Sequence, residues 1–178
     1  AFVRRIDKLP LPVKDSPGFL VNRVLGPYLN KALQLVDEGI APEALDAAAV
    51  AFGMPMGPIE LADTVGLDIC VAAGKELAGE HAMAPKKLSE LVSAGHLGRK
   101  TGRGFYVWVK GKAQKGAARV VAPELTDILL DPYLKEAQAA FAEGVVADAD
   151  LADAGLIFGT GFAPFRGGPL NYLQTRKR

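Results

Sequence analysis

One asparagine stands out among the residues of this sequence whose type and position could do chemistry. Asn22 lies in "DSPGFLVNRVLG", near the start of a strongly apolar stretch, and helical steps from it reach Leu25, Gly26 and Leu29. An amide among apolar residues needs hydrogen-bond partners. It can find them in the protein, as a helix cap or between helices, or it can bind a polar group of a ligand. The local spacing leaves both interpretations of Asn22 open.

A loop rich in glycine and aromatic residues, 158–167, is the second candidate. Glycine lets a ligand approach the backbone closely, and aromatic rings suit a flat or thin ligand. Tight packing of the turn is the alternative for each of these residues taken singly. Arg166 in the same loop could meet an anion, or be an ordinary exposed arginine. The residues concerned are Phe158, Gly159, Gly161, Phe162, Phe165 and Gly167.

Other patterns do not meet the requirements of a known kind of site. "GHLGRKTG" lacks a phosphate-binding loop's glycine before the lysine, since Arg99 is there, and "GTGFAP" has Pro164 where a dinucleotide fingerprint has its third glycine. The histidines, His81 and His96, have no acidic residue at metal-ligand spacing. Cys70 reads as a small core residue. We therefore predict no metal and no cofactor site in this chain.

A long helix, 16–38, must position Asn22. Ser16 can cap it, and Pro17 suits its first turn because proline's missing N–H has no partner there anyway. Pro27 inside the apolar pattern predicts a kink. Gly39 predicts the end of the helix.

Shorter helices and two irregular segments complete the first part of the chain. The basic, glycine-containing segment 111–122 is typical of a linker. Residues 1–15 contain two prolines and read as an extended arm without a partner, or as a disordered terminus. The predicted helices are 42–52, one that begins at Pro58 and is interrupted at Gly66, and 86–95.

After this linker the pattern begins again. "PYL" at 27–29 recurs at 132–134, an offset of 105, and Phe52-Gly53 matches Phe158-Gly159 at 106. Duplicated helical units commonly pack on each other to bury surface that neither can bury alone. We predict an all-α tandem repeat with a first unit at 16–110 and a second, shorter unit at 123–178.

The repeat bears on Asn22. At the offset of 105 its counterpart is Asp127, and that of Arg23 is Ile128. A residue that the unit needs for folding should recur in both copies, whereas Asn22 does not. We therefore expect Asn22 to act outside the unit, on a ligand or a neighbouring domain.

Composition excludes several classes of protein. The 21 Lys and Arg residues nearly balance the 20 Asp and Glu residues, so no electrostatic footprint for nucleic acid or an anionic membrane is present. No apolar run reaches the length of about 20 residues that a bilayer requires. A single cysteine excludes an intrachain disulfide and fits a reducing compartment. We expect a cytoplasmic protein.

Three blocks resemble one known family. "VKDSPGFLVNRVLGPYLNKALQLVDEG", "FGMPMGPIELADTVGLD" and "LGRKTGRGFY" are similar to the C-terminal domain of 3-hydroxyacyl-CoA dehydrogenases. "DPYLKEAQAAFAEGVV" and "FGTGFAPFRGGPLNYL" resemble the second copy of that domain in the two-copy form. That form is found in fatty-acid oxidation complex alpha subunits and related multifunctional enzymes of β-oxidation.

The resemblance implies an activity for the parent protein. The family oxidises an L-3-hydroxyacyl-CoA and passes hydride to NAD, which a preceding Rossmann domain holds beside a catalytic His-Glu pair. That domain and pair are absent from these residues, so the chain alone should not catalyse. The arm at 1–15 resembles the exit from the missing domain.

Two site residues follow from the resemblance. Asn22 matches the family's asparagine beside the reacting group of the substrate. Phe158 matches an aromatic position that contacts substrate in the two-copy relatives, where tyrosine is often found, and phenylalanine lacks the hydroxyl for a polar contact there. The alternatives are an autonomous helical module that binds acyl-CoA and a dimerisation domain. We expect a monomer, because the second copy would cover the pairing surface of the first.

Overall fold

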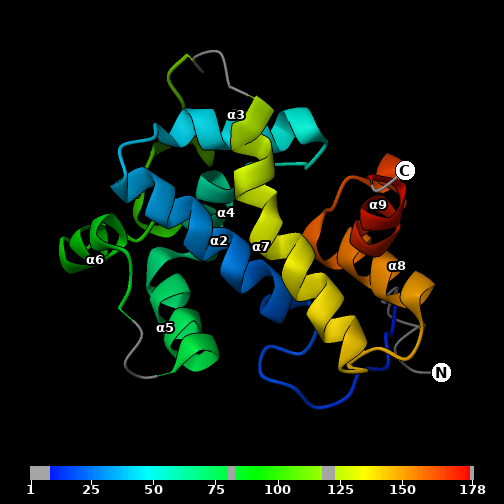
Figure 1. Cartoon of the computed structure of the whole chain (residues 1–178). Helices are drawn as coiled ribbons and strands as arrows, with labels where there is room; N and C mark the ends of the chain where they lie inside the picture. The colour runs from blue at the N-terminus through cyan, green and yellow to red at the C-terminus, as the bar shows by residue number, and fades with distance from the viewer. Residues whose placement is uncertain (1–8, 80–82, 118–122, 177–178) are drawn as a thin grey trace.

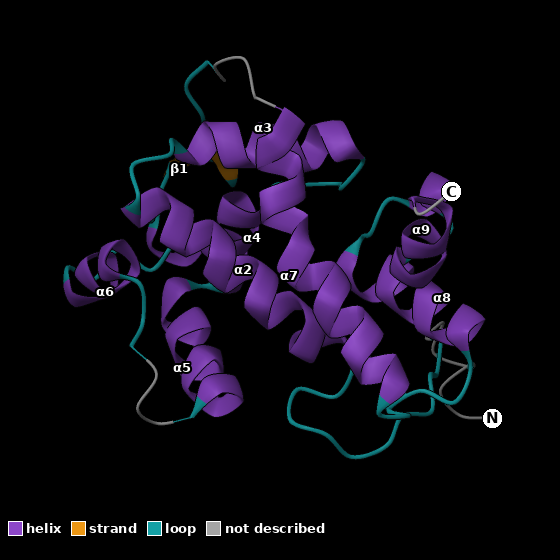
Figure 2. Cartoon of the chain, in the orientation of Figure 1, coloured by secondary structure: helices purple, strands orange, loops and turns teal. Residues whose placement is uncertain are grey.

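Helices make up most of the structure, a computed structural model that describes residues 9–79, 83–117 and 123–176 (Figures 1 and 2). The helices are α2 (Val21–Asp37), α3 (Pro42–Phe52), α4 (Pro58–Val65), α5 (Leu67–Ala78), α6 (Lys86–Ser93), α7 (Pro123–Ala142), α8 (Ala149–Thr160) and α9 (Pro169–Arg176). Two short 3₁₀ turns lie at Arg99–Thr101 and Pro164–Arg166, and the strands are β1 (Val107–Val109) and β2 (Lys112–Gln114). The predicted helices are confirmed, including the break at Gly66.

The start of α2 differs from the prediction. The helix begins at Val21, and residues 17–20 form a turn in which Gly18 and Phe19 have φ angles of 73° and 51°. Two successive left-handed residues cannot belong to a right-handed helix. Ser16 does not cap the helix; its hydroxyl accepts a hydrogen bond from Arg23 Nη1 at 3.2 Å. The helix runs through Pro27, as predicted.

The prediction of an all-α chain with a linker at 111–122 was wrong for part of this segment. Residues 112–114 form β2, which pairs antiparallel with β1. The next residue, Lys115, forms ion pairs with Asp46 and Glu60, both at 2.7 Å. The hairpin is therefore held against the helices that precede it. Residues 118–122 lie outside the described part of the chain.

The helices α2 and α7 run side by side through the middle of the molecule (Figure 1). Each carries a proline inside it, followed by a buried tyrosine, and the rings of Tyr28 and Tyr133 meet edge to face with centroids 5.9 Å apart. Phe162 extends this aromatic contact, because it stacks on Tyr133 and touches Phe52. One apolar core thus joins the first part of the chain to the last.

Two helix pairs are joined in the same way. Asp46 on α3 accepts a hydrogen bond from the backbone N–H of Ile59 at 2.9 Å, and Asp153 on α8 accepts one from Leu170 at 2.7 Å. In each case a buried carboxylate meets the first turn of a helix that begins with proline. A carboxylate is stabilised there by the positive end of the helix dipole.

The match between Phe52 and Phe158 was wrong. Phe52 is 5% exposed and belongs to the core, whereas Phe158 is 74% exposed. The left-handed glycine that follows α3 is Gly53, and the one that follows α8 is Gly161, an offset of 108 rather than 106. Phe158 is therefore free of the packing role that Phe52 has.

Candidate functional site

Asn22 lies in the first turn of α2 with its side chain exposed. We find no hydrogen bond from its amide to any of the residues that the structure describes. The structural interpretation required a buried amide with partners in the protein. The observed amide is open to solvent and free to bind a polar group.

A cleft of about 740 Å³ begins at Asn22. It runs between α2 on one side and α5 and α6 on the other. Gly26 lets the two sides approach, because a Cβ atom there would lie 2.6 Å from Leu77 Cδ1. Apolar side chains supply most of the lining, namely Leu25, Leu29, Leu33, Leu61, Val65, Ile69, Leu77, Met83 and Leu88. A mainly apolar ligand with a polar group near Asn22 would suit this lining.

Charged residues close the end of the cleft where Asn22 lies. Arg23 donates from Nε to Glu136 Oε1 at 2.6 Å and from Nη1 to Glu143 Oε2 at 2.7 Å. The hydrogen bond from Arg23 lowers the pKa of Glu143, and these two glutamates raise the pKa of Arg23. Arg23 and Glu143 are therefore ionised at neutral pH. The sequence pattern did not indicate either glutamate.

Phe158 does not line this cleft. It lies on α8 with its ring exposed, one residue before Gly159, which packs against Val21 at the start of α2. Asn22 and Phe158 thus come from neighbouring stretches of two helices in contact. The structure does not bring the two side chains into one enclosed pocket.

The segment 158–167, whose first three residues belong to α8, has side chains both in the core and at the surface. Phe162 is fully buried, whereas Phe165 is 75% exposed. Arg166 donates from Nε to the carbonyl oxygen of Phe52 at 3.0 Å, and its guanidinium lies 4.1 Å above the Phe52 ring. A cation at the C-terminus of α3 is favourable. These contacts give Arg166 a structural role.

The family is shown by a direct match. The model of the 3-hydroxyacyl-CoA dehydrogenase C-terminal domain matches residues 18–108, about half of the chain. The chain belongs to this family.

Relatives extend the match over nearly the whole chain. The fatty acid oxidation complex subunit alpha of Shewanella amazonensis is 40% identical over 195 aligned positions, which cover 98% of this chain and 27% of that protein. The corresponding subunit of Shewanella sp. strain MR-7 is 38% identical with 98% and 28% covered. The chain thus spans little more than a quarter of the curated relatives it matches.

Solved structures agree with this assignment. An (S)-3-hydroxybutyryl-CoA dehydrogenase from Ralstonia eutropha is 41% identical, with a TM-score of 0.55 over 61% of this chain and 41% of that one. A 3-hydroxybutyryl-CoA dehydrogenase from Escherichia coli K12 has a TM-score of 0.74 over 96% of this chain and 55% of that one. Because the second structure is 21% identical in sequence, its similarity shows a shared fold alone.

The block "LGRKTGRGFY" packs around a buried carboxylate. Asp63 accepts hydrogen bonds from the backbone N–H groups of Phe105 at 2.9 Å and Tyr106 at 3.0 Å, and from Trp108 Nε1 at 2.9 Å. Burial raises the pKa of Asp63, and these three bonds lower it in part. Gly98 packs so closely on Asp63 that a side chain would not fit. The block is therefore structural.

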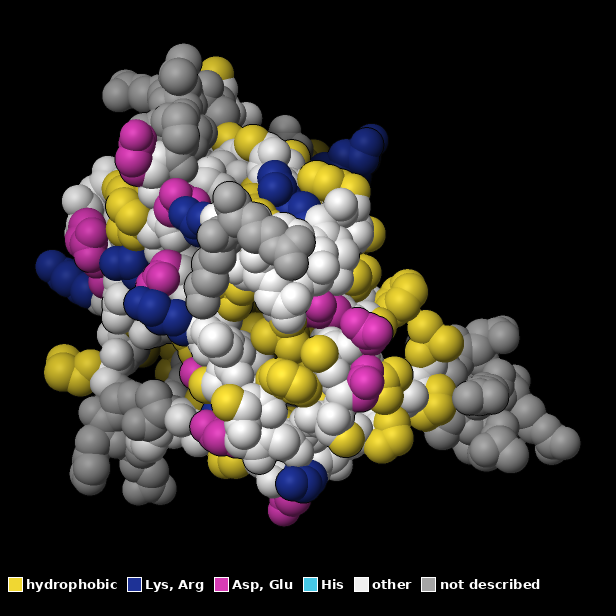
Figure 3. All heavy atoms as spheres, turned by 45° about the vertical axis from the view of Figure 1, so that its right-hand side comes forward, with side chains coloured by type: hydrophobic (Ala, Val, Ile, Leu, Met, Phe, Trp, Pro, Cys, Tyr) yellow, Lys and Arg dark blue, Asp and Glu magenta, His cyan; other side chains and the backbone are white. Residues whose placement is uncertain are grey.

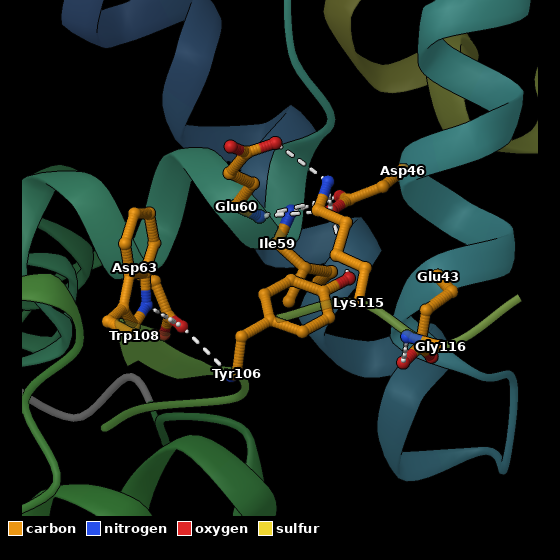
Figure 4. Close-up of polar contacts among 9 residues, drawn as sticks. All are labelled: Glu43, Asp46, Ile59, Glu60, Asp63, Tyr106, Trp108, Lys115 and Gly116. Atoms are coloured by element: carbon orange, nitrogen blue, oxygen red, sulfur yellow. Dashed lines mark hydrogen bonds and ion pairs between the residues drawn. The ribbon is translucent and has the colours of Figure 1, made fainter. Parts of the chain in front are cut away.

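Asp46 is a second buried carboxylate that accepts hydrogen bonds from several parts of the chain (Figure 4). Tyr106 Oη donates to its Oδ2 at 2.9 Å and Lys115 Nζ at 2.7 Å, and the three side chains point toward one another. Burial, together with the charge of Asp46, raises the pKa of Tyr106. Tyrosine, lysine and aspartate can form a proton-transfer site, but these residues line neither the cleft beside Asn22 nor the pocket around Arg166. Their contacts instead hold the hairpin to α3 and α4.

Metal and redox chemistry have no centre among the described residues. No group of three His, Cys, Asp or Glu side chains there could hold a metal ion. His96 bonds Leu91 through its backbone, and His81 lies outside the described residues. Cys70 lines the cleft, and burial raises the pKa of its thiol to about 11, so it is protonated at neutral pH.

NAD does not fit the described residues. Its usual site is a parallel βαβ unit with a glycine-rich turn, whereas the strands described here form one antiparallel hairpin. None of the helices in the described ranges has the length and apolarity that crossing a bilayer requires.

Proposed function

We propose that this chain is the acyl-CoA-binding, substrate-closing helical portion of an NAD-dependent L-3-hydroxyacyl-CoA dehydrogenase of fatty-acid β-oxidation. The observation that carries the proposal is the Asn22 amide, which lines an apolar cleft and makes no hydrogen bond to the described residues. The apolar lining of the cleft suits a fatty acyl chain. The amide suits the polar groups around the third carbon of that chain.

The role of Asn22 in this proposal is to orient the substrate. Its amide can donate a hydrogen bond to the 3-hydroxyl or thioester oxygen and accept another. A donor that is already aimed at the reacting group costs little reorganisation when the charge there changes. Phe158, exposed nearby on α8, would contact the substrate through its ring alone, since it has no hydroxyl.

The rest of the catalytic machinery belongs, in this proposal, to a Rossmann domain that precedes the chain. That domain would hold NAD and the His-Glu pair. The arm at 9–15 supports this direction of entry: Lys14 donates its backbone N–H to Val145 at 2.9 Å, and Leu11 packs on Gly155 of α8. The preceding domain would therefore arrive at the face that carries α8. Apolar side chains reach the surface on this side of the molecule (Figure 3).

We also propose that the two halves are copies of one helical unit. The aspartates on α3 and α8, the proline-tyrosine pairs on α2 and α7, and the left-handed glycines after α3 and α8 support this relationship. The units would be 16–110 and 123–178. Packed on each other, they would leave the chain monomeric.

The alternative is a helical module that binds acyl-CoA or dimerises without catalysis. Exposed apolar side chains such as Ile69 at 50% and Phe158 at 74% favour some partner surface. The full open reading frame separates the two proposals, because a preceding Rossmann domain supports the enzyme. Sedimentation of the 178-residue chain tests dimerisation.

The 178-residue chain should give no measurable NADH-dependent reduction of acetoacetyl-CoA. The proposal places the His-Glu pair that takes or returns the hydroxyl proton in the preceding domain. The assay follows NADH absorbance with a purified chain and with the full-length parent as the positive control. Turnover by the chain alone would contradict the proposed position of the active site.

Ending the chain near Gly116 should make the remaining residues dimerise or aggregate. This truncation removes α7 and exposes the apolar face of α2, including Tyr28, which is 1% exposed in the whole chain. Analytical ultracentrifugation of residues 1–116 and of the whole chain measures the effect. A soluble, folded monomer of residues 1–116 would contradict the proposed packing of two units.

A further inference from the structure

We infer that Arg23 is a positioning residue for Asn22, and that α7 takes part in the substrate site by holding Arg23. The inference rests on the proposed function of Asn22. It assigns a role in the reaction to the second half of the chain, which otherwise contributes packing and Phe158.

Arg23 joins three separate pieces of the chain at one point. Its guanidinium binds Glu136 at 2.6 Å and both carboxylate oxygens of Glu143, at 2.7 and 3.0 Å. It also donates to Ser16 Oγ at 3.2 Å, before the turn that precedes α2. The two glutamates lie 113 and 120 residues away along the chain. Together these bonds fasten the first turn of α2 to α7.

The first turn of α2 needs such a restraint. Leu20 occupies the position before the helix and makes no side-chain cap, and the preceding Gly18 and Phe19 are in left-handed conformations. The Arg23 N–H donates to the carbonyl oxygen of Gly18 at 3.2 Å, but no side chain caps this end of the helix, and helix ends without such caps fray more readily. Asn22, which makes no hydrogen bond of its own to the described residues, would move with that end. Arg23 is the neighbouring residue and is anchored outside the helix.

The geometry requires arginine rather than any cation. Arg23 uses Nε for one carboxylate and its two Nη atoms for the other, a planar fork that fixes direction as well as distance. Lysine presents a single flexible ammonium group and cannot reproduce this arrangement. Arg23→Lys therefore keeps a positive charge opposite the two glutamates but holds the first turn of α2 less firmly. It tests positioning separately from charge.

The experiment is a double-mutant cycle in the full-length parent enzyme with Asn22→Ala and Arg23→Lys, alone and together. We expect Arg23→Lys to lower kcat about tenfold with KM changed less than about twofold, since positioning affects the transition state more than binding. In the Asn22→Ala background, Arg23→Lys should lower kcat no further, because the amide that it positions is gone. Glu143→Gln, on an exposed side chain, should reproduce the effect of Arg23→Lys in both backgrounds.

Lys100→Gln is the matched control, because Lys100 forms a comparable exposed ion pair with Asp68 away from α7. It should leave kcat unchanged. A role of Arg23 in stability alone predicts a lower melting temperature with parental kcat, and an independent catalytic role predicts that the two losses multiply. Either result overturns the inference and leaves the proposed function in place. Parental kcat in Asn22→Ala overturns the proposed function itself and the inference with it.

Discussion

Replacing Asn22 by alanine in the full-length parent enzyme should lower kcat by about 10²–10³, because one preorganised hydrogen bond to a reacting group typically contributes that much. The side chain is exposed and makes no hydrogen bond to the residues that the structure describes, so its loss orphans no partner in the protein. The melting temperature should therefore barely change. Measurement of kcat and melting temperature on the same preparation tests both expectations.

Gln34→Ala is the control for this substitution, because Gln34 is an exposed amide on the same helix, outside the cleft. It should leave both kcat and melting temperature at parental values. A destabilised Asn22→Ala enzyme with parental kcat would favour the structural interpretation of the amide instead. In that case the loss of stability would be about 1–3 kcal/mol, the usual effect of leaving buried partners unpaired.

Replacing Asp63 by alanine should lower the free energy of unfolding by about 3–5 kcal/mol. The substitution leaves two backbone N–H groups and the Trp108 indole N–H without their acceptor, in a part of the core where Asp63 itself is fully buried. Such a loss is a large part of the total stability of a domain, about 5–15 kcal/mol. Urea unfolding of the 178-residue chain, followed by circular dichroism and by Trp108 fluorescence, measures it.

Two further variants make the test specific. Asp63→Asn keeps the shape but turns an amide NH₂ toward N–H donors, so it should be destabilised as well. Asp68→Asn changes an exposed carboxylate five residues on, whose partner is Lys100, and should leave stability unchanged. Parental stability of Asp63→Ala would mean that the block around Tyr106 does not depend on this carboxylate.

Local patterns predicted most of the helices and could not predict the turn before α2. Prolines in first turns and glycines after helix ends mark α3, α4 and α5 correctly, because each signal acts within a few residues of its position. "SPGF" carries the same kind of signal and was read as a first turn. The structure instead places Phe19 at a φ angle of 51°, which residues other than glycine seldom adopt. Asn22 itself lies where its helical spacing predicts, because it lines the cleft together with Leu25, Gly26 and Leu29.

The hydrogen bonds that the buried carboxylates accept could not be predicted, because their donors are far away in the sequence. Asp46 and Asp63 look like ordinary helix carboxylates until the hairpin brings Tyr106, Trp108 and Lys115 to them. One sequence contains no sign of which distant residue a carboxylate will meet. The resemblance to a family identified Asn22 from its motif, but it did not reveal that Glu136 of α7 and Glu143, directly after that helix, hold the adjoining arginine.

The hydrogen bonds of Asp46, Asp153 and Arg23 also differ in when they can form during folding. Asp46 and Asp153 reach partners 13 and 17 residues away, whereas Arg23 reaches Glu143 across 120 residues. Closing the longer loop costs about 2 kcal/mol more chain entropy than closing the shortest one. Contacts of short range therefore form early and the α2–α7 contact late. During synthesis, the first half of the chain can assemble its helix pair at once, while the end of the cleft beside Asn22 waits for α7 to be made.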